Sequence, residues 1–251
     1  MSTDYAALER ELLSAIGPLR LVAVSYLSTA PAGVSQFSGT VPSGCTFWRL
    51  ASTGNGFYTV PSDHLNCPIG SYTHAIDLPA GRAGELEQTL TLMAEIGYVK
   101  MDDVPSFPRL PETPAFVYYA PLGNAVVAPD VVIAVGRPAS LMRLQEAGER
   151  AGAASSLPLV GRPTCMALPA AIAHGAVMSG GCIGNRVYTA LGDDELYLMI
   201  PGVRLADIVR ELGVIAKAND TLREYHERRK EALTAEPSAL GYYEIFVSSE
   251  S

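Results

Sequence analysis

The alternation of apolar and polar positions predicts both helices and strands. Apolar residues recur at helical spacing over residues 5–16 and stop at Gly17-Pro18, which predicts a helix with Thr3 or Asp4 as its cap. Residues 19–27 (LRLVAVSYL) are almost continuously apolar and rich in β-branched side chains, which predicts a buried strand. Further strands are expected over residues 57–60, 115–121, 131–136, 188–191, 195–200 and 242–247. Helices are expected over residues 83–96, 140–151, part of 163–178, and 205–233, with a loop at 61–70.

Strands and helices follow one another without the regular rhythm of βαβ units, so the sequence predicts an α+β fold: a mixed sheet with flanking helices. The chain has 251 residues, which suits one large domain or two small ones. A Pro-rich connector at residues 104–114 suggests an internal boundary. We therefore expect a single domain, residues 1–251, made of two intimately packed halves.

Two segments share the pattern G-C-x-x-x-R, at residues 44–49 and 181–186, and each precedes a tyrosine-containing strand that ends in proline. An internal duplication would explain this and would make the halves pseudo-symmetric, with one site assembled from corresponding loops. Chance is the alternative, because glycine is abundant here and the spacing from Arg49 to Tyr58 differs from that between Arg186 and Tyr197.

Composition narrows the class of protein. Hydrophobic residues make up 48% of the chain, which provides a sizeable core and argues against bulk disorder. The formal net charge is −8 and no long Lys or Arg run occurs, so neither nucleic acid nor an anionic membrane is an expected partner. No apolar stretch suits a membrane helix or a secretory signal, which predicts a cytoplasmic protein. Signatures of dinucleotide folds, P-loops, zincins and α/β-hydrolases are absent from the sequence.

The four cysteines, Cys45, Cys67, Cys165 and Cys182, carry the strongest chemical signal. Each lies near glycine or proline in a loop-forming context, whereas a buried structural cysteine usually sits inside an apolar run. In a reducing compartment such cysteines are more often thiols, metal ligands or redox groups than disulfides. Glycines let backbone N–H groups approach an anionic sulfur, and Cys-Pro pairs occur at iron–sulfur ligands.

The spacing of these cysteines excludes the compact ferredoxin and zinc-ribbon templates. No C-x-x-C occurs, and successive cysteines are 22, 98 and 17 residues apart, so a four-cysteine site requires tertiary folding to assemble it. We expect an iron–sulfur centre of the [4Fe–4S] type, with zinc or haem as alternative cofactors. Structural thiols, or one nucleophilic cysteine such as Cys67 near His64, are the competing interpretations.

Other side chains in the same loops are candidates for substrate chemistry. His64 and His74 could act as general acid–base groups or as haem ligands. Arg49 and Arg186 could hold an anionic substrate, or they could pair with acids as structural struts. His64, Arg49 and Arg186 form the candidate catalytic set, and the four cysteines form the candidate cofactor- and metal-binding set.

Three motifs also resemble the domain of unknown function 169 family: SGCTFWRLA at 43–51, DHLNCPIGSYT at 63–73 and GCIGNRVYTALGDDELY at 181–197. The resemblance covers nearly the whole chain. It implies that the first, second and fourth cysteines, with Arg49, His64 and Arg186, are family-pattern positions. Cys165 matches more loosely, and the family implies no established reaction.

The sequence thus predicts a cytoplasmic redox or metal-dependent protein with an iron–sulfur centre and a pocket for a small anionic or flat ligand. If the protein is an enzyme, it is expected to be an oxidoreductase. A thiol enzyme without metal and a non-catalytic small-molecule binding module are the rival functions. The substrate, the electron-transfer partner and the oligomeric state, a homo-oligomer included, stay open.

Overall fold

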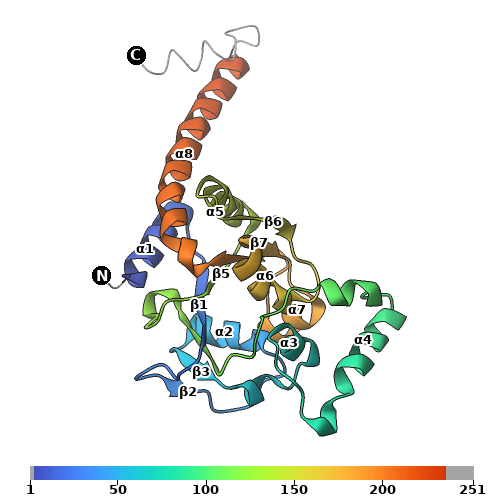
Figure 1. Cartoon of the computed structure of the whole chain (residues 1–251). Helices are drawn as coiled ribbons and strands as arrows, with labels where there is room; N and C mark the ends of the chain where they lie inside the picture. Colours follow the sequence, from blue (N-terminus) through green and yellow to red (C-terminus); the bar gives the residue numbers. More distant parts are fainter. Residues whose placement is uncertain (1–2, 236–251) are drawn as a thin grey trace.

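A computed structural model describes residues 3–235, with the backbone alone at residues 154–158, 233 and 235. Its strands form one eight-stranded sheet in the order β2-β3-β4-β1-β5-β8-β7-β6 (Figure 1). The strands are β1 (Arg20–Leu27), β2 (Ser35–Gln36), β3 (Phe57–Thr59), β4 (Phe116–Pro121), β5 (Val131–Gly136), β6 (Ala154–Leu159), β7 (Ala176–Ser179) and β8 (Leu196–Pro201). The β2–β3 and β6–β7 pairs are parallel, and the other pairs are antiparallel. The predicted α+β fold with a mixed sheet is confirmed.

Helices pack on both faces of this sheet. They are α1 (Tyr5–Ile16), α2 (Cys45–Thr53), α3 (Pro68–Thr73), α4 (Glu85–Glu95), α5 (Pro138–Arg150), α6 (Ala167–His174), α7 (Ile183–Thr189) and α8 (Leu205–Ala235). One core cluster joins α1, α5 and α8 to the sheet, and a second joins α2 and α6 to its opposite face. Alternate residues of β5 belong to the two clusters: Val131 and Ile133 face α2 and α6, whereas Val132 and Ala134 face α5 and α8. Burial on both faces explains why the central strands are continuously apolar.

A third, smaller cluster stands apart from the sheet. It combines Ile69 of α3, Leu90 of α4 and Val104 of the 3₁₀ segment Met101–Ser106. Two cysteines, Cys67 and Cys165, pack against it. In Figure 1, α3 and α4 lie beside α7, at the end of the molecule away from the projecting α8. This unit forms the outer wall of the candidate site described below.

Most of the predicted elements agree with the structure, and two differ. The expected loop at 61–70 contains a 3₁₀ turn, Pro61–His64, and the start of α3. Pro68 occupies the first turn of that helix, where its missing N–H costs nothing. The strand expected to begin at Tyr188 is the end of α7, whose final turn is followed by Ala190 with a left-handed φ of 52°. The strand expected at 242–247 lies outside the described residues.

Within residues 3–235, no helix is both long enough and apolar enough to cross a membrane.

Candidate functional site

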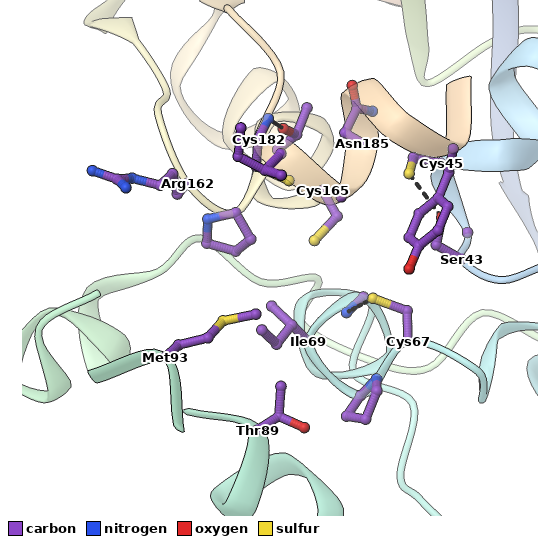
Figure 2. A pocket seen from close by; sticks show the side chains of 18 of the residues that line it. Ser43, Cys45, Cys67, Ile69, Thr89, Met93, Arg162, Cys165, Cys182 and Asn185 are labelled. Atoms are coloured by element: carbon purple, nitrogen blue, oxygen red, sulfur yellow. Dashed lines mark hydrogen bonds between the residues drawn. The ribbon is translucent and has the colours of Figure 1, made fainter. Parts of the chain in front are cut away.

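All four cysteines line one cavity, which has a volume of about 460 Å³. It lies between the α2–α6–α7 side of the sheet and the outer α3–α4 wall, and its lining is predominantly apolar. Figure 2 shows Cys45 and Asn185 at one end of the cavity and Arg162 and Met93 at the other, with Ile69 between them. Segments separated by more than a hundred residues of sequence therefore meet at one place.

Each cysteine occupies the beginning of a helical segment. Cys45 is the first residue of α2, Cys67 is the N-cap of α3, and Cys182 is the N-cap of α7. Cys165 lies in the 3₁₀ turn Thr164–Met166, which leads directly into α6. The four thiols are free and partly buried. The first and last G-C-x-x-x-R segments thus each start a helix, and α2 packs against α7.

The glycines of the two Gly-Cys pairs allow close approach of neighbouring groups. A Cβ at Gly44 would lie 3.2 Å from His64 Nδ1, and one at Gly181 would lie 2.9 Å from Asn185 Oδ1. Gly181 also has a φ of +75°, in the region that favours glycine. Gly181 therefore both allows the backbone turn into α7 and leaves room for the side chains that pack closely against it.

Burial keeps three of these thiols, those of Cys45, Cys67 and Cys165, protonated in the metal-free protein. It raises the pKa of Cys45 to about 11, and it raises the pKa of Cys67 and of Cys165 as well. Negative charge on Cys67 or Cys182 further raises the pKa of Cys45 and of Cys165, because these sulfurs lie within electrostatic range of one another. Two hydrogen bonds oppose this effect: Ser43 Oγ lies 2.9 Å from Cys45 Sγ, and the Gly70 N–H donates to Cys67 Sγ at 3.3 Å.

The spacing of the donors bears on which metal centre they could hold. Among the described residues, no three His, Cys, Asp or Glu side chains stand where they could hold one metal ion. A tetrahedral zinc–thiolate site needs sulfurs roughly 3.8 Å apart, given Zn–S bonds of about 2.3 Å. An iron–sulfur cluster is a larger body, so it takes its thiolates at wider spacing. The four thiols thus do not form a ready-made site for a single metal ion in the described part of the chain.

His64 and His74 also line the cavity, and both are buried and neutral. Burial lowers the pKa of His64 to about 3 and that of His74 to about 4. His64 Nε2 lies 2.8 Å from Thr59 Oγ1, which itself donates to the Val117 carbonyl. Thr59 Oγ1 therefore accepts a hydrogen bond from the Nε2–H of His64, and the Nδ1 of His64, beside Gly44, is the unprotonated nitrogen.

His74 has the opposite tautomer. Its Nδ1 lies 3.0 Å from the Gly70 carbonyl oxygen, which can only accept a hydrogen bond. The Nε2 atom then accepts from the Tyr26 hydroxyl at 3.2 Å. The rings of His64 and His74 are stacked with centroids 5.9 Å apart, so the two histidines form one buried polar unit against the cysteine cavity.

The two candidate arginines lie elsewhere. Arg49 is exposed and lines a separate hollow of about 210 Å³, which shares Trp48 with the cysteine cavity. Arg186 donates to the Gly180 and Gly192 carbonyls, at 2.7 and 2.9 Å, and to Asp193 at 2.8 Å. This is the strut arrangement considered as the alternative for Arg186. Neither arginine is among the residues that line the cysteine cavity.

Three polar lining residues that matter for the site, Ser43, Asn185 and Arg162, were not among the predicted site residues. Ser43 contacts the Cys45 sulfur, as described above. Asn185 is 2% exposed, and among the described residues neither polar atom of its side chain has a partner at full hydrogen-bond geometry. Weaker hydrogen bonds of Asn185 with Cys45 and with Tyr197 oppose the rise in the pKa of those two groups. Arg162 lies at the mouth with its guanidinium 4.4 Å from the centre of the Tyr98 ring. The only signal in the sequence was proximity: Asn185 is inside the second G-C-x-x-x-R segment, and Arg162 precedes Cys165 by three residues.

The fold and the site define an α+β protein with an apolar, cysteine-lined cavity between the helices on one face of its sheet and a small outer helical wall. Comparison with known families gives a match over residues 18–211 to DUF169, described as Uncharacterised ArCR. The chain belongs to this family, as its motifs suggested. No curated protein and no solved structure matches the chain.

Proposed function

We propose that this protein is a redox protein that binds an iron–sulfur cluster of the [4Fe–4S] type through Cys45, Cys67, Cys165 and Cys182. The observation that carries the proposal is the convergence of all four cysteines of the chain on one cavity. They come from four separate segments, so sequence proximity does not explain their meeting. When bound, such a cluster supplies one-electron transfer.

The walls of the cavity suit the proposed ligand set. Apolar side chains exclude water, and the Gly70 amide that donates to Cys67 Sγ is the kind of backbone contact that stabilises cluster thiolates. Because burial holds three of the thiols protonated, ligation releases protons as the cluster forms. These three thiols are thus uncharged in the metal-free protein and become anionic when they ligate the metal.

Two observations favour this proposal over a thiol enzyme that uses Cys67. A reactive cysteine needs a lowered pKa, usually from a nearby cation, whereas burial raises the pKa of Cys67. The histidine nearest in sequence, His64, is neutral, with a pKa of about 3, and engages Thr59. A thiolate–imidazolium pair is therefore not favoured.

The test is spectroscopy and elemental analysis of protein purified without air. We expect brown protein with sulfide-to-iron charge-transfer absorption, and iron with acid-labile sulfide in near-equal amounts. Each single Cys→Ser variant should lose most of the absorption. Thr89→Ala is the matched control, because Thr89 lines the same cavity without a thiol, and it should retain the cluster.

Three results would contradict the proposal. Protein that takes up no iron after anaerobic reconstitution is one of them. Zinc in place of iron and sulfide is the second, and the third is an iron content unchanged by all four serine substitutions. Thermal unfolding of each variant distinguishes loss of the cluster from loss of the fold.

A further inference from the structure

The cavity carries one permanent charge, although the chain as a whole carries a net charge of −8. No Asp, Glu or Lys occurs among the described residues that line it, and both of its histidines are neutral at pH 7. The remaining charged group is the guanidinium of Arg162. A small molecule inside this cavity therefore meets an apolar surface and a single cation.

The guanidinium of Arg162 is held in place at the entrance. It stacks on the Tyr98 ring, and the Tyr98 hydroxyl in turn accepts a hydrogen bond from the Ile183 N–H at 3.1 Å, at the start of α7. Arg162 is exposed and has no ion-pair partner among the described residues. Its hydrogen-bond donors are therefore free to receive an anion.

Apolar side chains surround this cation. Met93, Ile96 and Phe107 line the cavity on the outer wall, and Ile183 and Tyr188 line it on α7. Ile96 and Ile183 are 70% and 64% exposed, so the apolar surface continues from the interior to the rim. In Figure 2, Met93 and Arg162 lie at the end of the cavity opposite Cys45, which separates this region from that thiol.

We propose that this outer part of the cavity binds an apolar monoanion: a small organic acid whose hydrocarbon or aromatic body lies against Met93 and Phe107 and whose carboxylate meets Arg162. The volume of about 460 Å³ falls within the usual range for small-molecule sites. This inference rests on the proposed function in that it names the substrate class of the same site. The binding of the anion itself depends on Arg162 and the apolar wall.

The test compares octanoate with 1-octanol, which have the same chain length and differ in charge, by titration calorimetry of the full chain. Wild-type protein should bind octanoate roughly ten times more tightly than octanol, because a charge-assisted hydrogen bond to a guanidinium adds about that much affinity. Arg162→Gln should remove the difference and leave octanol binding unchanged. Arg162→Glu should prefer octylammonium over octanoate.

Arg109→Gln is the matched control. Arg109 also stacks on a tyrosine ring, at 4.1 Å from the centre of Tyr72, but it does not line the cavity. This variant should keep the wild-type preference for octanoate. Equal binding of octanoate and octanol by the wild type, or an equal loss in Arg109→Gln, would overturn the inference.

The titrations are run on metal-free protein and on iron-reconstituted protein. A preference for octanoate that depends on Arg162 in protein that takes up no iron would support this inference while contradicting the cluster proposal. An assembled cluster in protein that shows no preference for octanoate would support the cluster proposal and contradict this inference. The two proposals therefore fail by different measurements.

Discussion

Asn185 is the residue whose environment is most at odds with a purely structural role. It is almost fully buried, and among the described residues its amide makes only weak hydrogen bonds, with Cys45 and Tyr197, that fall short of full geometry. A buried polar group left in this state costs roughly 1–3 kcal/mol, and such groups persist mainly where function requires them. Because Asn185 lies next to Cys45, we attribute this cost in folding free energy to a role in the cysteine cavity.

Replacing this amide by a hydrocarbon of similar size should therefore stabilise the metal-free protein. We expect Asn185→Leu to raise the free energy of unfolding by about 1 kcal/mol, because it removes a buried amide whose hydrogen bonds are poorly formed. Asn66→Leu is the contrasting variant, since Asn66 Nδ2 donates to the Val41 carbonyl at 2.7 Å, and it should lower stability. Urea denaturation of the metal-free proteins measures both. A loss of stability in Asn185→Leu as large as that in Asn66→Leu would contradict this account of the amide.

At the scale of the element, the connections between strands and helices restrict the chain more than the helices themselves do. Gly202 follows β8, and its N–H donates to the Asp130 carbonyl at 2.8 Å. A Cβ at this position would overlap the Pro129 carbonyl oxygen. Gly213 lies inside α8, is exposed, and has nothing near its would-be Cβ.

The same substitution should therefore have opposite effects at these two glycines. Gly202→Ala should lower the free energy of unfolding by about 3 kcal/mol, because backbone atoms must move to relieve the overlap. Gly213→Ala should raise it by about 0.5–1 kcal/mol, since alanine is the better residue in a helix interior. Chemical denaturation of the two variants beside the wild type gives both values. Destabilisation by both substitutions to a similar extent would rule out this explanation.

The same contrast between elements and connections explains what the sequence could predict. The helix at 5–16 and the strand at 19–27 were found because their apolar period and the Gly17-Pro18 stop are local signals. The helical turn after Pro61 and the end of α7 were missed because short helices carry few periods. The sequence does not identify Arg162 as a site residue, because its position depends on Tyr98 and only tertiary folding brings the two side chains into contact.

At the scale of the whole molecule, the candidate site was partly predictable. Unusual loop contexts identified the cysteines, and the requirement that they converge followed from their spacing. The sequence could not specify which polar side chains would join them. Arg49 and Arg186 have the same motif position as each other, yet one is exposed at a separate hollow and the other braces a loop. Residue type in a motif therefore predicts proximity to a site better than it predicts a role.

The buried histidine pair gives the folded molecule a pH dependence that can be predicted with its sign. His64 and His74 have pKa values of about 3 and about 4 in the folded protein, and about 6.5 when unfolded. Below pH 6.5 the unfolded state binds more protons than the folded state does. The contribution of the two histidines to the free energy of unfolding is therefore fully present above that pH and is lost as the pH falls toward the folded-state pKa values. Between pH 7 and pH 5 each histidine should cost roughly 2 kcal/mol. No carboxylate occurs among the described lining residues to offset this loss.

Urea denaturation at pH 7 and pH 5 measures this loss, and proton NMR of the imidazole rings should show two histidines that do not titrate above pH 5. His64→Gln should remove about half of the pH dependence, because one protonation site remains. His174→Gln is the control, since His174 is exposed on α6, and it should leave the dependence intact. If His174→Gln reduces the pH dependence as much as His64→Gln does, the buried pair is not its source. The acid sensitivity of the fold would then have to arise away from the cysteine cavity.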